Sequence, residues 1–129
     1  EAQLFCEEKS VEQALRDYFT AVATCFTSKD TPAGCFMINT SATLAASSKE
    51  IANTVKSRHA MQEETLSAFL AQRQQRGEIP AQCNPQLLAQ YLSCILQGMS
   101  ISAREGATLE KLQIISDTTL RLWPELLKI

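Results

Sequence analysis

The stretch NPQLLAQYLSCILQGMSISAREGA, residues 84–107, decides the fold of this chain. Asn84 followed by Pro85 is a capping residue with proline at the first helical position, which predicts a helix from there to Gly106. The apolar side chains of this helix lie nearly all the way round it: Leu87, Leu88, Tyr91, Leu92, Cys94, Ile95, Leu96, Met99 and Ile101. A helix of this kind must be covered on two sides.

Apolar residues at three-and-four spacing predict another helix, which begins after Ser10 and stops near residues 28–30. Ser10 and Gln13 form a capping-box start, and the sequence TPAG at residues 31–34 breaks the pattern. A short apolar segment follows at residues 35–46. Periodicity alone leaves strand and helix open for this segment, but its alanine and leucine content favours a helix.

Two further helices are indicated by their caps. Ser47 and Glu50 form a second capping box, which opens a long helix that is expected to end at Gly77. One side of this long helix carries Ile51, Val55, His59, Gln62, Leu66, Phe69 and Leu70. Thr108 caps the last helix, which Pro124 is expected to kink or end. One face of the last helix carries Leu109, Leu112, Ile115, Leu122 and Leu126, with Ile114, Leu120 and Leu127 off that face.

The composition agrees with a single all-α domain of about five helices. The chain has 129 residues, of which 45% are hydrophobic and 20% charged, as in one compact globular domain. Only four glycines and four prolines leave little material for the turns of a sandwich or barrel. The net charge of −2 argues against a broad phosphate-binding surface, since nucleic-acid binding needs clustered lysine and arginine.

The cysteines favour a reduced, cytoplasmic protein. There are five of them, an odd number without a C-x-x-C pair, whereas a small secreted scaffold would contain an even set. Cys25 and Cys94 fall inside apolar helical patterns, where free cysteine behaves as a small hydrophobic residue. The sequence also contains no apolar run near the roughly 18 residues that a membrane span needs, so no membrane partner is expected.

The last two helices carry more apolar surface than a domain of this size can cover. The excess in residues 85–103 and 108–127 predicts an interface between subunits, with an isologous homodimer as the default form. The alternative is that the first of the two is a central core helix. The candidate interface residues are Leu88, Tyr91, Ile95, Gly98, Met99, Ile115, Thr118 and Leu122.

Catalytic chemistry has little support in the sequence. The single histidine excludes a histidine-rich metal site, and no glycine-rich phosphate loop is present. His59 and Glu63 lie one helical turn apart, but a metal ion would need at least one further ligand. A histidine at the edge of a buried face is the more ordinary interpretation. We therefore expect no catalytic residue, no metal site and no cofactor, with a metal-dependent enzyme at His59 and Glu63 as an alternative.

A ligand pocket is the more plausible kind of site, because pockets combine apolar and aromatic walls with a few polar groups. For each aromatic residue or methionine the alternative is ordinary core packing. Polar groups on the same faces are more informative, because a buried polar group needs a partner. The candidate ligand-binding residues are Tyr18, Phe19, Phe36, Met37, Asn39, His59, Gln62 and Phe69.

Three segments together resemble the C-terminal regulatory domain of the tetracycline-repressor (TetR) family of bacterial transcription factors. They are GCFMINTSATLAA at residues 34–46, RGEIP at residues 76–80, and the opening stretch at residues 84–107. The resemblance implies an all-α ligand-binding and dimerisation domain whose last two helices pair with their counterparts in a four-helix bundle. It also implies that effector binding alters operator affinity through N-terminal helix-turn-helix domains.

The sequence departs from the family in lacking that DNA-binding domain. Residues 1–9 are therefore expected to be the end of a connecting helix, and residues 10–129 the effector-binding and dimerisation domain. Operator DNA is expected as a partner only through the missing domain. The effector does not carry over from the family, and the mainly apolar faces favour a neutral or weakly polar small organic molecule. The alternative function is a homodimeric protein–protein interaction module without a small-molecule pocket.

Overall fold

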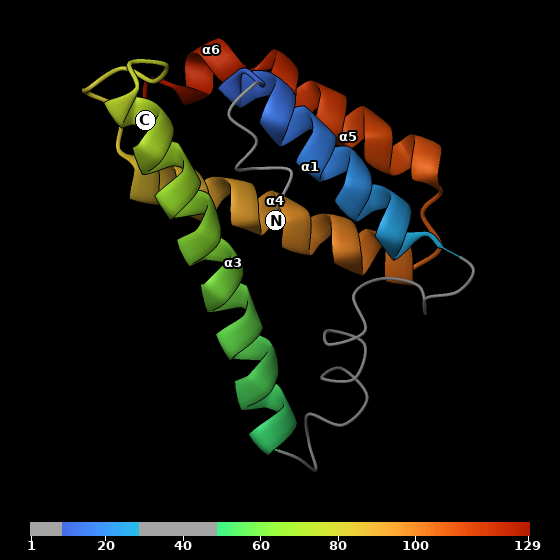
Figure 1. Cartoon of the computed structure of the whole chain (residues 1–129). Helices are drawn as coiled ribbons and strands as arrows, with labels where there is room; N and C mark the ends of the chain where they lie inside the picture. The colour runs from blue at the N-terminus through green and yellow to red at the C-terminus, as the bar shows by residue number, and fades with distance from the viewer. Residues whose placement is uncertain (1–8, 29–48) are drawn as a thin grey trace.

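The computed structural model describes residues 9–28 and 49–129, and within these ranges the regular structure is entirely helical (Figure 1). The prediction of an all-α fold is confirmed. The predicted short helix at residues 35–46 and the predicted cap Ser47 lie outside the described residues. The helices are α1 (Val11–Phe26), α3 (Lys49–Gln75), α4 (Pro85–Arg104), α5 (Leu109–Arg121) and α6 (Trp123–Leu126).

The helix ends follow the chemistry that the sequence indicated. At the start of α1, α4 and α5, a side-chain oxygen of the capping residue accepts hydrogen bonds of 3.0–3.2 Å from backbone N–H groups of the first turn; the caps are Ser10, Asn84 and Thr108. Gly77 and Gly106 have φ angles of +83° and +98°. These positive values are readily adopted by glycine and allow the chain to leave α3 and α4.

The cap of α4 provides a first test of stability. Asn84 Oδ1 accepts from two backbone N–H groups, 3.0 and 3.2 Å away, so Asn84→Ala leaves two donors without this partner. We expect the free energy of unfolding to fall by about 1 kcal/mol. Asn84→Asp retains the acceptor oxygen, so its free energy of unfolding should fall much less. Urea unfolding measures both variants. Equal losses in the two variants would assign the effect to something other than capping.

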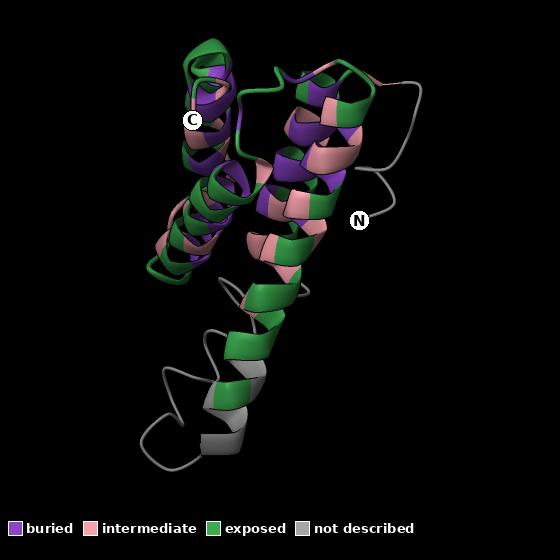
Figure 2. Cartoon of the chain, turned by 90° about the vertical axis from the view of Figure 1, so that its left-hand side faces the viewer, coloured by how far each residue is buried: buried purple, intermediate pink, exposed green. Residues whose placement is uncertain are grey.

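The helices pack as two pairs that share one core. In Figure 1, α1 lies along α5, and α3 runs beside α4 at one end before diverging from the rest. α1 also contacts α4, which joins the two pairs. Figure 2 shows that the buried residues of α3 gather toward the end that leads to α4. The largest fully buried side chains are Arg73, Phe19, Phe69, Leu15, Leu66, Leu70, Leu88, Leu92, Leu96, Met99 and Leu112.

α5 buries a different face from the one that the sequence predicted. The predicted face included Leu122 and excluded Leu120, but Leu120 is 1% exposed and Leu122 is 45% exposed. α5 ends at Arg121, and the chain resumes a short helix at Trp123, with Pro124 in its first turn as expected. Ser116 and Thr119 lie on the buried face beside Leu120. Because these two residues are polar, the pattern of apolar residues does not indicate that this face is buried.

Two smaller predictions about the first helices were wrong. α1 ends at Phe26, before the expected stop near residues 28–30. Cys25 and Cys94 are exposed free thiols, and neither fills the core as its apolar neighbours in the sequence suggested.

A buried arginine ties the end of α3 to the start of α1. The Arg73 side chain is 1% exposed, and its guanidinium donates to the carboxylate oxygens of Glu78 at 3.0 and 3.2 Å. It also donates to the backbone carbonyl of Lys9 and lies 5.2 Å from the centre of the Phe69 ring. We call these four residues the Arg73 clasp. The clasp fixes where the chain enters α1 relative to the end of α3.

Candidate functional site

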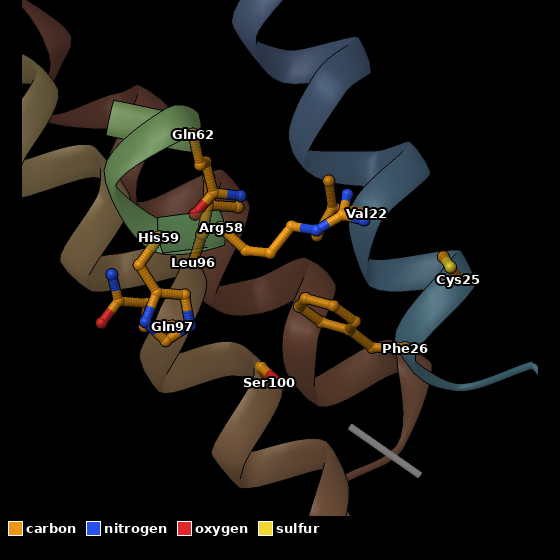
Figure 3. Close-up of a pocket in the computed structure, with 9 residues that line it drawn as sticks. All are labelled: Val22, Cys25, Phe26, Arg58, His59, Gln62, Leu96, Gln97 and Ser100. Atoms are coloured by element: carbon orange, nitrogen blue, oxygen red, sulfur yellow. The ribbon is translucent and has the colours of Figure 1, made fainter. Parts of the chain in front are cut away.

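A cavity of about 190 Å³ lies between α1, α3 and α4 (Figure 3). Each of the three helices contributes residues to it, so its shape depends on how α1 and α4 pack against α3. The lining residues are Val22, Cys25, Phe26, Arg58, His59, Gln62, Leu96, Gln97 and Ser100.

The cavity combines apolar side chains with polar groups from α3 and α4. Val22 and Phe26 form the α1 wall and Leu96 the α4 wall. Figure 3 shows the Arg58 side chain extending from α3 toward Val22, and the Phe26 ring turned from α1 into the space between the helices. The polar lining residues are Arg58, His59 and Gln62 on α3 and Gln97 and Ser100 on α4, so an occupant would meet polar groups from two of the three helices.

His59, one of the residues that line this cavity, has an unsatisfied polar atom. Its Nε2 atom is buried and has no hydrogen-bond partner among the described residues. Burial also lowers the pKa of His59 below the ordinary value of an imidazole. The side chain is therefore mainly neutral at pH 7.

The lowered pKa of His59 makes a prediction about acid stability. Below about pH 6.5 the unfolded chain binds a proton at this side chain more readily than the folded chain does. The free energy of unfolding should therefore decrease as the pH is lowered from 7 to 5. In the His59→Gln variant the free energy of unfolding should decrease less over the same range. Because the chain has one histidine, the imidazole signals in a ¹H NMR titration report its pKa directly. A pKa above 6.5 would contradict the assignment.

The structure brings together only part of the predicted ligand-binding set. His59 and Gln62 line the cavity, and Gln62 Nε2 donates to the Tyr18 hydroxyl across 3.5 Å, which places Tyr18 beside it. Phe19 and Phe69 are fully buried and are not among the lining residues. Phe36, Met37 and Asn39 lie outside the described residues.

The contribution of α4 to the cavity was not predicted from the sequence. Leu96, Gln97 and Ser100 line it, although that segment was predicted to serve an interface. A single helix with apolar residues on almost every side gives no sign of which neighbour each side will meet. Val22 and Cys25 were also missed, because their spacing on α1 is that of an ordinary buried face.

A second feature of interest is a row of exposed residues on α4 and α5, which we call the apolar stripe. Leu87 is 49% exposed, Tyr91 41% and Ile101 46% on α4, and Ile114 on α5 and Leu122, the residue that follows α5, are exposed as well. The spacing of three and four residues places each helix's members on one side. The apolar stripe consists of Leu87, Tyr91, Cys94, Gly98 and Ile101 on α4, Ile114 and Thr118 on α5, and Leu122 directly after α5.

The predicted interface residues divide into three groups by exposure. Four of them belong to the apolar stripe: Tyr91, Gly98, Thr118 and Leu122. Ile95 and Ile115 are half-buried against the core. Leu88 and Met99 are 0% and 1% exposed, inside the core of the same chain. The exposed members Leu87, Ile101 and Ile114 were not predicted as interface residues. On α4, the spacing of three and four residues between positions 87, 91, 94, 98 and 101 does indicate that they lie on one side of the helix.

The described part of the chain contains neither a metal-binding cluster nor a membrane-spanning helix. No cluster of three or more potential metal ligands from His, Cys, Asp and Glu occurs there, so His59 and Glu63 have no third such residue beside them in that part. None of the described helices is long and apolar enough to cross a bilayer.

Comparisons with known proteins agree on one family. A family model described as "Tetracyclin repressor-like, C-terminal domain" matches residues 11–113. The HTH-type transcriptional repressor ComR of Escherichia coli (strain K12) is 73% identical over 128 residues, which are 99% of this chain and 61% of that protein. The chain thus spans about three fifths of the length of this curated relative.

A solved structure has the same fold at low sequence identity. It is the TetR family transcriptional regulator CifR, a cysteine mutant complexed with double-stranded operator DNA. The match has a TM-score of 0.82 and 19% identity, and it covers 95% of this chain and 64% of that one.

Proposed function

Because this chain belongs to the family of tetracycline-repressor-like C-terminal domains of transcriptional regulators, we propose that it is the effector-sensing and dimerisation domain of a bacterial regulator. The relatives are transcriptional regulators and not enzymes. In this proposal, residues 10–129 bind a small organic effector and a second copy of the chain. Residues 1–9 connect them to a helix-turn-helix domain outside this sequence, through which operator DNA is bound.

The observation that carries the proposal is the position of α4. Leu96, Gln97 and Ser100 on one side of this helix line the cavity, and the α4 members of the apolar stripe lie on another side. A displacement of α4 by an effector would therefore reach the partner subunit directly. Allosteric control needs two sites that bias one shared element, and α4 is suited to be that element.

A second copy of the same chain is the occupant that fits the apolar stripe. Exposed apolar rows of this kind mark interaction surfaces in soluble proteins. Two stripes related by a twofold axis would bring α4 and α5 of each subunit into a four-helix bundle. The description of CifR as a DNA-bound regulator and of ComR as an HTH-type repressor supports the further proposal that such a dimer sets the spacing of two DNA-binding domains.

Native mass spectrometry of the purified chain tests this function. We expect a dimer, together with small-molecule adducts after incubation with an effector panel. The matched variant is Val22→Trp, whose larger side chain projects from a half-buried position into the cavity and should remove the adducts while leaving the dimer. A monomer would contradict the dimerisation proposal. A dimer that binds nothing in either form would favour the interaction module without a pocket.

A further inference from the structure

We propose that the two subunits of the dimer come closest where α4 crosses the partner's α4, at Cys94 and Gly98. The inference rests on the proposed dimerisation function and deepens it, because it names the helix at the centre of the interface and the residue that sets the distance between the subunits. It is argued from the distribution of charge, the sizes of the side chains in the apolar stripe and the position of Gly98.

The distribution of charge places α4 at the centre of the interface and α5 at its rim. No Asp, Glu, Lys, Arg or His occurs from residue 85 to residue 103, although α4 has an exposed side. On α5, the exposed Ile114 has exposed charged residues before and after it along the helix: Glu110, Lys111, Asp117 and Arg121. The core of a protein interface is depleted of charged residues, whereas its rim is polar.

The α4 part of the apolar stripe has large side chains at both ends and small ones in the middle. Leu87 and Tyr91 are exposed toward the start of α4 and Ile101 toward its end. Between them lie Cys94 and Gly98, which are also exposed. Because the distance between two packed helices depends on the side chains at their contact, a second helix can approach most closely at this middle part.

Neither packing nor backbone conformation among the described residues requires glycine at position 98. Unlike Gly77 and Gly106, Gly98 does not have a positive φ angle. Apart from its two chain neighbours and the adjacent backbone of α4, a β-carbon added there would meet no described atom within 4 Å. Glycine is also a poorer helix former than alanine. Close approach of another backbone accounts for a glycine at such a position.

The proposed crossing lies at the same level of α4 as the cavity. Leu96, Gln97 and Ser100 line the cavity, and each is within two residues of Gly98 in the sequence. A ligand that shifts this part of α4 therefore changes the distance between the subunits at the point where they are closest.

The test is sedimentation equilibrium of Gly98→Ala, which adds one methyl group in the middle of the stripe. We expect its dimer dissociation constant to rise at least about tenfold, because the added carbon lies between closely packed helices at two symmetry-related positions. Urea unfolding at concentrations where both chains are monomeric should show the variant to be at least as stable as the parent chain. Loss of fold would not produce this combination of a weaker dimer and a stable monomer.

Thr20→Ala is the matched control, because it also introduces alanine at an exposed helical position, on α1 and outside the apolar stripe. Its dissociation constant should stay within about twofold of that of the parent chain. A second comparison tests which helix is central. Ile101→Ala should weaken the dimer more than Ile114→Ala, because truncation costs most near the centre of an interface. The opposite order would place α5 at the centre and overturn the proposal.

The remaining outcomes separate this inference from the proposed dimerisation. If the bulky and charged Gly98→Glu dissociates the dimer but Gly98→Ala leaves it unchanged or strengthens it, the stripe is the interface but the two α4 helices are not in close contact at Gly98. This inference then fails while the dimerisation function stands. If the parent chain is a monomer, both fail together.

Discussion

Gly98→Glu is expected to convert a dimer of this chain into monomers. Gly98 lies within the apolar stripe, and apart from its two chain neighbours and the adjacent backbone of α4, a β-carbon added there would meet no described atom within 4 Å. The glutamate side chain can therefore be accommodated within one chain, and the helix gains a residue of better helical propensity. In a dimer the same side chain places a charge against the partner's apolar surface at two symmetry-related positions. We expect the dimer dissociation constant to rise by at least about 100-fold.

Sedimentation equilibrium of the purified variant measures this effect, with circular dichroism to establish that the helices remain. Thr20→Glu is the control, because Thr20 is exposed on α1 and lies outside the apolar stripe. It should leave the dissociation constant unchanged. If Gly98→Glu also remains dimeric at the concentrations where the parent chain does, the stripe is not the dimer interface.

Arg73→Leu is expected to cause a large loss of stability, because it removes a buried and hydrogen-bonded charge. The replacement removes the guanidinium of the Arg73 clasp and leaves the Glu78 carboxylate and the Lys9 carbonyl without their shared partner. Glu78 is 27% exposed, so water compensates for part of the loss. We expect the free energy of unfolding to fall by about 2–4 kcal/mol, or roughly 10 °C in Tm.

Arg76→Leu is the control for the clasp. Arg76 Nε lies 3.4 Å from a Glu78 oxygen, but the Arg76 side chain is 40% exposed. An ion pair at the surface contributes little, so the loss should stay below about 1 kcal/mol. Thermal unfolding followed by circular dichroism measures both variants. Similar losses of stability in the two variants would show that burial of the Arg73 guanidinium does not strengthen its ion pair with Glu78.

The helix boundaries were predictable because local chemistry sets them. A cap such as Asn84 acts through a side chain and a backbone N–H two or three residues away, and the sequence contains both groups. The same holds for Gly77 and Gly106, whose positive φ angles end α3 and α4. Propensity and capping within one turn are therefore sufficient to place these boundaries to within a few residues.

The faces of the helices were less predictable, because contacts distant in sequence determine them. On α5 the buried side contains Ser116 and Thr119, so the apolar pattern pointed to Leu122 where the structure buries Leu120. On α4 nearly every side is apolar, and only the positions of α1 and α3 decide that Leu96 faces the cavity and Leu88 the core. His59 and Gln62 could be predicted as candidate lining residues, because polar residues are rare on the buried side of a helix.

Because α4 borders the cavity on one side and carries part of the apolar stripe on another, the response to a ligand would depend on the concentration of the protein itself. If ligand binding and subunit association both depend on this helix, thermodynamic reciprocity requires that each changes the equilibrium constant of the other by the same factor. The apparent ligand affinity would then vary with the total concentration of the protein, and the Gly98→Glu monomer would have a single affinity at every concentration. A cell could thus retune the threshold of its sensor by changing how much of it is made.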